Sequence, residues 1–413
     1  MSDLATLLLT HGFRAIETDR DRRGATATYP SRLLGSRAVV VGTEEGARTF
    51  YDPAATRRAD AVPAALGWLL FGRGAVHTLD HTEHAERKDL LRAQMGVEGV
   101  TRCAAEAGRL LGEILDEAGE REVDLHDALV VAYGVAALRW AGFSLAPHVE
   151  VDLARTYARV VDGFGLRGSA YARAWVARAR TDAWARLTLR AIRHGELVVA
   201  PGTPAHAIAA SDLDERTAAV ELGNLVRPTI ATSWLGCFAV LDAHRWTDGE
   251  TWLERSAARR RSFLHEVRRT APFVPALAAV ARRPLEVDGV AVAEGERLLL
   301  DVPGINHDPA TYPAPDRFEP ERFVGTEPPP YGFVPQGGGR VRGHRCPGED
   351  LVTVLLDATL DEICARGVVP VGSWDVDLRR IPTLPGGTPY ARATLLSSTA
   401  DVRVLPRREA ATF

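Results

Sequence analysis

The chain has 413 residues, of which 46% are hydrophobic and 25% are charged, and its formal net charge is −4. This balance is ordinary for a globular protein in water and gives no sign of a nucleic-acid or acidic-membrane surface. The apolar runs are too short to span a bilayer and the N-terminus lacks a basic signal region, so we expect a cytoplasmic protein without a membrane partner. The cysteines are too widely spaced for a disulfide framework, which is typical of a reducing compartment; they are Cys103, Cys237, Cys346 and Cys364.

The first part of the chain passes from irregular structure into helix. Residues 1–35 are polar and predict no regular element. The run at 38–41 predicts a strand, and 44–51 predicts a helix that ends before a proline. From about 62 to 284, helical patterns dominate, which predicts a mainly α fold.

Two helices of this region differ in character. Residues 216–244 carry apolar side chains on nearly every face, which predicts a buried helix. Residues 168–197 are rich in alanine and arginine and predict an amphipathic helix. We place its arginines on a solvated face, together with the run at 259–261; they are Arg178, Arg180 and Arg186.

The last part of the chain combines short strands with a long loop. Residues 285–302 predict short strands joined by tight turns, and 303–345 form a loop dense in proline and glycine. A structureless stretch of this length usually carries function. No repeat or linker appears, so we expect one domain over residues 1–413, mainly α with small β-sheets.

The long loop leads into Cys346, around which the candidate site is built. Residues 333–349 read Phe-Val-Pro-Gln-Gly-Gly-Gly-Arg-Val-Arg-Gly-His-Arg-Cys-Pro-Gly-Glu, and a helical pattern begins directly behind the cysteine. The three glycines let something flat approach the main chain. We expect the helix N-terminus and three cations to lower the pKa of the thiol, namely Arg342, His344 and Arg345. A lone cysteine is more often a small buried apolar residue, but a thiolate held here would be a strong ligand for haem iron.

This loop resembles the haem-binding loop of the cytochrome P450 superfamily. The residues that carry the likeness are Phe333, Gly337, His344, Cys346 and Gly348. Its longer form, with Pro-Gln-Gly-Gly-Gly ahead of Gly-His-Arg-Cys, is similar to one subgroup, the fatty acid peroxygenases. The resemblance implies the cytochrome P450 fold, a triangular helical prism around haem. It also implies that haem b is bound through Cys346 as the metal ligand, with His344 and Gly339 as further haem contacts.

Other segments match the superfamily in the expected order. Residues 266–269 read Glu-Val-Arg-Arg and 320–323 read Pro-Glu-Arg-Phe, and they resemble the ion network behind the haem that Arg322 completes. Glu and Arg three apart on a helix are also a common surface pair. His84 and Lys88 lie four apart on one predicted helix face and by resemblance hold the haem propionates, the alternative being a solvated face.

The segment Arg227-Pro228 lies inside the long buried helix, where conventional P450 monooxygenases carry an acid followed by threonine. Proline there removes a helix hydrogen bond, and a buried arginine needs an anionic partner or several acceptors. That partner is either an internal acid, Glu221 or Asp242, or the carboxylate of a substrate held bidentately above the haem.

Three more residues are expected near the substrate by resemblance. His77 occupies a position where hydroxylating peroxygenases mostly show glutamine and alkene-forming members show histidine, the alternative being a simple hydrogen-bonding role near the haem. Phe71 and Phe273 match apolar pocket residues, although Phe273 is equally plausible as core. The chain also departs from the family pattern at His81, at residues 270–271 and at Arg167, which leaves the length and polarity of the substrate open.

Together these features predict a haem-thiolate peroxygenase. It would use hydrogen peroxide to oxidise a carboxylic acid, on this reading a fatty acid, at the α or β carbon, giving a hydroxy acid or a terminal alkene. Arg227, Pro228 and His77 would serve catalysis, and no redox partner would be required. The alternatives are a monooxygenase fed by redox partners, a biosynthetic oxidase on another carboxylate and, in a different class, a non-catalytic haem sensor.

Overall fold

The computed structural model describes residues 3–165, 168–246 and 252–393. The longer helices are α1 (Leu4–His11), α2 (Ala15–Arg23), α5 (His81–Arg92), α6 (Val97–Ala118), α7 (Leu125–Ala141), α8 (Pro147–Asp162), α9 (Gly168–Arg193), α11 (Glu215–Trp246), α12 (Ala257–Thr270) and α14 (Glu349–Ala365). The shorter ones are α3 (Glu44–Phe50), α4 (Ala64–Leu70), α10 (Pro204–Ala209) and α13 (Val302–Asn306), with 3-10 turns η1 (Gly12–Arg14), η2 (Val76–Thr78) and η3 (Trp252–Glu254).

The strands form three small sheets. A five-stranded sheet has the order β1 (Tyr29–Leu33), β2 (Ser36–Val41), β8 (Arg297–Asp301), β5 (Ala276–Ala281) and β3 (Thr56–Arg57). Its β2–β8 pair is parallel, with Val40 opposite Leu299, and its other pairs are antiparallel. The other sheets are β4 (Val123–Asp124), β10 (Tyr390–Ala393) and β9 (Val368–Val371), and the hairpin β6 (Leu285–Val287) with β7 (Val290–Val292).

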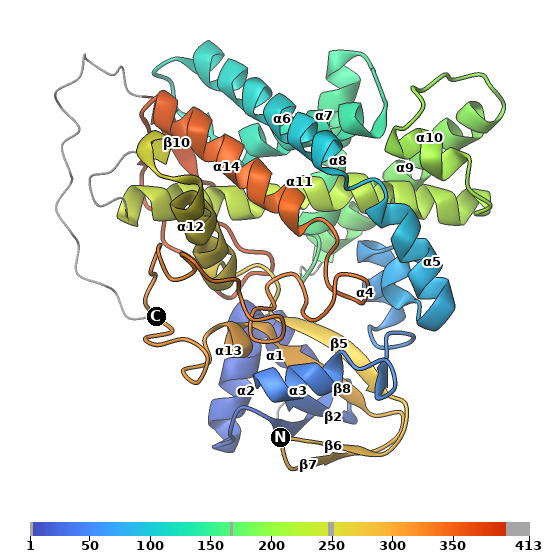
Figure 1. The fold of residues 1–413 in the computed structure, drawn as a ribbon, viewed down its shortest axis with the longest axis vertical. Helices are drawn as coiled ribbons and strands as arrows, with labels where there is room; N and C mark the ends of the chain where they lie inside the picture. Colours follow the sequence, from blue (N-terminus) through green and yellow to red (C-terminus); the bar gives the residue numbers. More distant parts are fainter. Residues whose placement is uncertain (1–2, 166–167, 247–251, 394–413) are drawn as a thin grey trace.

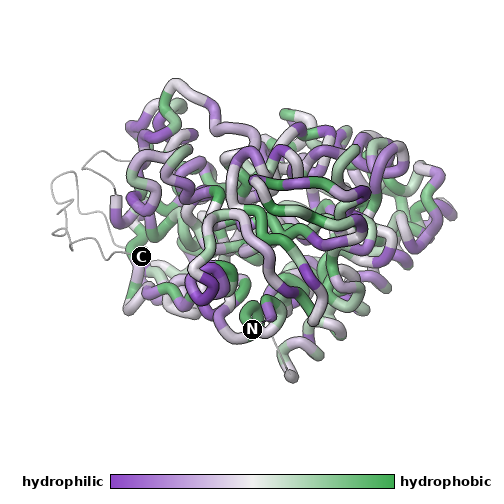
Figure 2. The backbone as a smooth tube through the Cα atoms, turned by 90° about the horizontal axis from the view of Figure 1, so that it is seen from below, coloured by the Kyte–Doolittle hydropathy of each residue, from purple (hydrophilic) through white to green (hydrophobic). Residues whose placement is uncertain are grey.

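Helix α11 is the centre of the helical part. It packs against α7, α8, α9, α12 and α14, and Figure 1 shows it crossing the helical layer above the sheet. Nearly all its residues between 218 and 243 are buried, because apolar side chains cover every face of the helix. The prediction of a long buried helix at 216–244 is confirmed. In Figure 2 apolar segments lie mostly in the middle of the molecule and polar ones toward its periphery.

The first 35 residues are where the sequence interpretation was wrong. They contain α1, α2 and β1 instead of irregular structure. Asp3 caps α1 by accepting a hydrogen bond from the Ala5 N–H, and Gly24 ends α2 in the left-handed conformation. Helix α2 is polar apart from a few buried residues, so its stability comes from packing against the sheet and not from periodicity.

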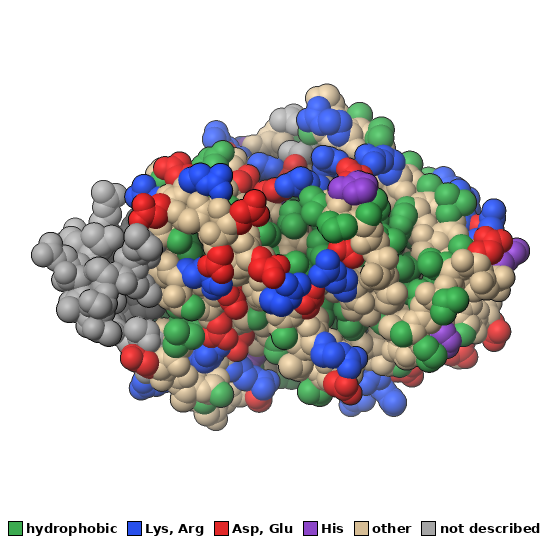
Figure 3. All heavy atoms as spheres, turned by 90° about the horizontal axis from the view of Figure 1, so that it is seen from above, with side chains coloured by type: hydrophobic (Ala, Val, Ile, Leu, Met, Phe, Trp, Pro, Cys, Tyr) green, Lys and Arg blue, Asp and Glu red, His purple; other side chains and the backbone are tan. Residues whose placement is uncertain are grey.

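The rest of the sequence interpretation matches the structure more closely. The predicted elements at 38–41, 44–51 and 285–302 correspond to β2, α3 and the strands β6, β7 and β8. Strand β5 lies in the region predicted as helical, because pairing with β3 and β8 outweighs the helix preference of its alanines. Oppositely charged side chains are interspersed over the face in Figure 3. Among the described helices, none combines the length and apolar character that a membrane span requires.

Candidate haem and substrate site

The cysteine loop is held in shape by backbone hydrogen bonds and by glycines. The Cys346 N–H donates to the carbonyl of Gln336 over 3.0 Å, and the Gly348 N–H lies 3.4 Å from the cysteine sulfur. Gly337 and Gly339 have φ of +88° and +78°, and a Cβ on Gly337 would lie 3.1 Å from the His344 carbonyl. These positions therefore require glycine, and the sulfur is fixed three residues before α14 begins.

The expected lowering of the thiol pKa by nearby cations is wrong for this arrangement. Burial is the main influence and raises the pKa of Cys346, with Glu349 adding to the rise. Arg342 is exposed, Arg345 pairs with Glu349 over 2.7 Å, and burial lowers the pKa of His344, which keeps that imidazole neutral. A directly bound metal ion is therefore what would hold the sulfur as a thiolate.

A cluster of buried basic residues lies beside the loop. His84 and Lys88 come from one face of α5, and the His84 ring lies against the ring of His344 at a centroid distance of 4.0 Å and a tilt of 33°. Lys88 Nζ donates to the carbonyl of Arg345 over 2.7 Å. Burial and the neighbouring cations lower the pKa of His84 to about 4 and that of Lys88 to about 8. Within the described part of the chain, no carboxylate lies within ion-pair distance of either side chain, so this cluster suits an anionic group.

The accessibility of three side chains indicates an internal space between the loop and α11. Protein closely surrounds His77 and Cys346, yet both side chains keep accessible surface. Pro228 is likewise exposed, although its neighbours on α11 are buried. One sulfur donor, with a lysine and two imidazoles beside it that lack an acidic partner among the described residues, fits an iron porphyrin with two propionates. Cys346 would bind the iron, and His84 and Lys88 would face the propionates.

Arg227 is a buried residue of α11 whose guanidinium group is only partly hydrogen-bonded. It is 5% exposed, and its Nη2 donates to Asn224 Oδ1 over 2.9 Å. Its Nη1 is buried and has no hydrogen-bond partner among the described residues. Burial, followed by the nearby Arg178, lowers the pKa of Arg227 to about 9, which means that the charged form lacks compensation.

Neither internal acid considered as a partner pairs with Arg227. Glu221 accepts from Arg87 Nη1 over 3.0 Å, from the Val76 N–H over 2.8 Å and from Asn224 Nδ2 over 3.0 Å. It therefore reaches Arg227 only through Asn224. Asp242 lies about four helical turns further along α11, where its electrostatic neighbours are Arg245 and Glu266. The free N–H of Arg227 Nη1 is thus left for a group that the described residues do not supply.

His77 is an electrostatic neighbour of both Arg227 and the basic cluster. Its ring stacks on Phe71 at a centroid distance of 4.4 Å and an interplanar angle of 15°. The surrounding protein, then Arg227, Lys88 and His84, lower the pKa of His77. The structure therefore brings His77, Phe71, Arg227 and the basic cluster into one region, with a neutral imidazole at pH 7.

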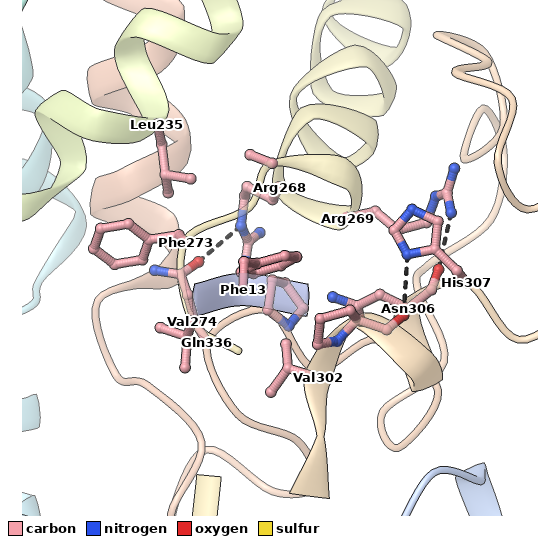
Figure 4. Close-up of a pocket in the computed structure, with 13 residues that line it drawn as sticks. Phe13, Leu235, Arg268, Arg269, Phe273, Val274, Val302, Asn306, His307 and Gln336 are labelled. Carbon is pink, nitrogen blue, oxygen red and sulfur yellow. Dashed lines mark hydrogen bonds between the residues drawn. The ribbon is translucent and has the colours of Figure 1, made fainter. Parts of the chain in front are cut away.

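Phe273 lines the pocket drawn in Figure 4. It is partly buried beside Leu235, and Arg268 crosses the pocket to donate to Gln336 Oε1 over 2.8 Å. This pocket borders the cysteine loop, because Gln336 also accepts from the Cys346 N–H. A contact of Phe273 with substrate stays a prediction. Of the departures from the family pattern, His81 begins α5 with a φ of +53°, and Arg167 lies outside the described residues.

Several residues near the site were missed from sequence. Asn224 carried no motif, although its spacing of three from Glu221 and Arg227 would have placed all three on one helix face. Arg178 was placed on a solvated face but is 4% exposed. Its helical spacing from Ala174, Thr181 and Ala185 could have indicated that it is buried, since these positions share the buried face of α9.

The known proteins that resemble this chain are cytochromes P450. Residues 261–363 match the family Cytochrome P450. Putative cytochrome P450 137 of Mycobacterium tuberculosis is 26% identical, with 81% of this chain and 76% of that protein aligned.

Solved structures are more similar still. Cytochrome P450SP alpha (CYP152B1) in complex with (R)-ibuprofen is 31% identical, with 95% of this chain and 98% of that chain covered and a TM-score of 0.88. Cytochrome P450EX alpha (CYP152N1) with myristic acid is 31% identical, with 94% and 96% covered and a TM-score of 0.88. The chain therefore belongs to the cytochrome P450 superfamily of haem-iron oxidoreductases, in the fatty acid peroxygenase subfamily that its cysteine loop resembles.

Proposed function

We propose that this oxidoreductase uses hydrogen peroxide to oxidise a carboxylic acid, a fatty acid or a related acid, at the α or β carbon. The observation that carries the proposal is the buried Nη1 of Arg227, which has no partner in the described part of the chain. A guanidinium in a desolvated site binds a carboxylate with two parallel hydrogen bonds. The relatives solved with myristic acid and ibuprofen, both carboxylic acids, support this choice of ligand.

Arg227 would hold the carboxylate in the internal space that Cys346 and His77 line. Peroxide activation needs a base that removes one proton and an acid that returns it to the leaving oxygen. The residues after Arg227 are Pro228 and Thr229, and Glu221, the acid on the same face of α11, is engaged by Arg87 and two other donors. The substrate carboxylate is therefore the group positioned to move this proton, and oxidation falls on the carbons nearest to it.

Haem b bound through Cys346 supplies the peroxide activation and hydrogen abstraction in this proposal, since a thiolate ligand favours O–O cleavage. His84, Lys88 and His344 hold the propionates, and Gly339 shapes the loop around the haem. His77 is neutral at pH 7 and donates at most one neutral hydrogen bond. We therefore propose the hydroxy acid as the main product and the terminal alkene as the lesser one.

A monooxygenase fed by redox partners is the second candidate. It is disfavoured because Arg227 and Pro228 occupy the place where the acid-threonine pair would deliver protons to bound oxygen. A haem sensor is disfavoured because it has no need of a buried arginine held with a spare donor beside the haem space.

Turnover of carboxylic acids with hydrogen peroxide alone tests the proposal. The haem-loaded protein is incubated with saturated acids and, as the matched control, with their methyl esters, and products are identified by mass. The acids should give 2- or 3-hydroxy acids and the esters should give none. Turnover that appears only with a reductase and reduced nicotinamide would overturn the peroxygenase proposal in favour of the monooxygenase.

A further inference from the structure

A second pocket lies beside the N-terminal half of α11, between that helix, α9 and the turn after α4. It has a volume of about 200 Å³ and is rich in arginine. We call it the arginine pocket, and its charged and aromatic walls are formed by Trp68, Arg73, Trp175, Arg178, Asp182, Arg186 and Arg216. Four guanidinium groups thus face a single carboxylate across the pocket.

Most of this positive charge has no partner in the pocket. Asp182 is paired with Arg178, whose Nε donates to it over 2.9 Å. Arg186 reaches Glu215 only at 3.8 Å, and Glu215 is bound more closely by Arg190 at 2.7 Å.

The other two arginines of the pocket, Arg73 and Arg216, are less engaged in ion pairs than Arg178 and Arg186 are. Arg73 lies 3.9 Å from the centre of the Trp68 ring, and within residues 3–165, 168–246 and 252–393 neither Arg73 nor Arg216 forms an ion pair. The pocket therefore attracts an anion.

The inner wall of the pocket is built for its arginine. Arg178 is 4% exposed, and its Nη1 donates to the carbonyl of Leu70 over 3.4 Å. Gly72 has a φ of +93°, and a Cβ there would lie 2.5 Å from Arg178 Nη2 and 2.8 Å from Val220. The left-handed backbone at position 72 favours glycine, and a side chain there would displace the Arg178 guanidinium and the Val220 methyl groups.

Polar groups continue from the arginine pocket toward Arg227. Arg178 is close enough to Arg227 to act on it electrostatically, and Tyr157 lies within the influence of both. The Tyr157 hydroxyl is buried without a partner among the described residues and lies 3.9 Å from the place of a Cβ on Gly223. Phe71, which stacks on His77, directly precedes Gly72 in the pocket wall. Arg227, Gly223 and Val220 are spaced by four and three positions on α11 and share one helix face, along which a ligand bound at Arg227 would extend to the pocket.

We propose that the substrate is a dicarboxylic acid, whose reacting carboxylate binds Arg227 and whose far carboxylate binds in the arginine pocket. This inference rests on the proposed function and names its substrate class. Val220 and Arg216 precede Arg227 by seven and eleven positions on α11, or about 10 to 16 Å along its axis. An extended chain advances roughly 1.2 Å per bond, a third of the rise of an extended residue. Dicarboxylic acids of about 10 to 14 carbons therefore span the two ends.

Binding of dodecanedioic acid and dodecanoic acid to the haem-loaded protein tests this inference. The two acids have the same length and differ only in the far carboxylate. At low salt the native protein should bind the diacid at least fivefold more tightly, followed through the haem absorption spectrum. The double variant Arg73→Ala/Arg216→Ala should lose this preference and keep its affinity for dodecanoic acid. Arg180→Ala is the matched control, because Arg180 is exposed on α9 and pairs with Asp152 outside the pocket.

Equal or tighter binding of dodecanoic acid by the native protein would overturn the inference, as would a preference for the diacid that survives in the double variant. Either result leaves the proposed function standing, because dodecanoic acid still binds. Failure of both acids to bind the native protein would instead overturn the proposed function and this inference together.

Discussion

Two buried arginines of this protein differ in how completely their donors are used. Arg269 donates through Nε and Nη2 to the two oxygens of Glu266 over 2.8 and 2.7 Å. Its Nη1 donates to the carbonyls of Asn306 and Pro315, each over 2.8 Å. Arg322 adds a bond to Glu266 over 3.2 Å, so the expected ion network is confirmed and fully satisfied.

Arg227 is also buried, but among the described residues it has one side-chain acceptor, Asn224, and one nitrogen without a partner. The first arginine therefore stabilises the fold, because every donor is paired inside the protein. The second costs stability until an anion arrives, because a buried charge without a partner is unfavourable. The comparison shows that an arginine which binds a ligand is identified by its unpaired hydrogen-bond donors more than by its burial.

The largest effect is expected from Glu266→Gln. It leaves two buried arginines without their shared charge, so the free energy of unfolding should fall by about 3 to 5 kcal/mol. Urea denaturation measures it. Glu321→Gln is the control, since Glu321 is 56% exposed and should cost at most about 0.5 kcal/mol. A loss as small as that of the control would remove the contrast between the two arginines.

Arg227→Leu should behave in the opposite way. Replacing an incompletely paired buried arginine by an apolar side chain should leave the free energy of unfolding unchanged or raise it by about 1 kcal/mol. Denaturation of the protein without substrate measures this. A loss comparable to that of Glu266→Gln would mean that Arg227 is a structural residue like Arg269.

Asn224→Ala should produce a smaller and more specific change. Asn224 positions Arg227 and is itself fixed by Glu221. Without it the guanidinium loses its orientation, so the affinity for a carboxylic acid should fall about tenfold while the affinity for the methyl ester stays the same. Equal losses for acid and ester would show that the residue only supports packing.

His77→Gln should have the smallest effect on the protein and should act on the products. The free energy of unfolding should change by less than about 1 kcal/mol, because the His77 ring stacks on Phe71 and forms no side-chain hydrogen bond with the described residues. The proportion of alkene among the products, measured by mass, should fall from a minor fraction toward none. An unchanged proportion would exclude His77 from the choice of reaction.

Features of the fold and of the site could be predicted from the sequence where a local pattern of residues determines them. The buried helix α11 and the ion network were predictable because they rest on local periodicity and short motifs. Helix α2 and strand β5 were not, because distant packing decides them. Arg178 was misplaced because arginine composition alone did not show which face of α9 meets α11. The raised pKa of the Cys346 thiol could not be predicted from the sequence either, because burial in the folded protein is its main cause and not the charges that neighbour it in the chain.

The spare donor of Arg227 is the central claim, and binding of one carboxylic acid and its methyl ester tests it most directly. Dissociation constants are measured through the haem spectrum for the native protein and for Arg227→Leu. The native protein should bind the acid about 100-fold more tightly than the ester, as expected for a charged hydrogen-bonded pair of roughly 3 kcal/mol. The variant should retain haem and bind both equally weakly. Tight binding of the acid by Arg227→Leu would contradict the account.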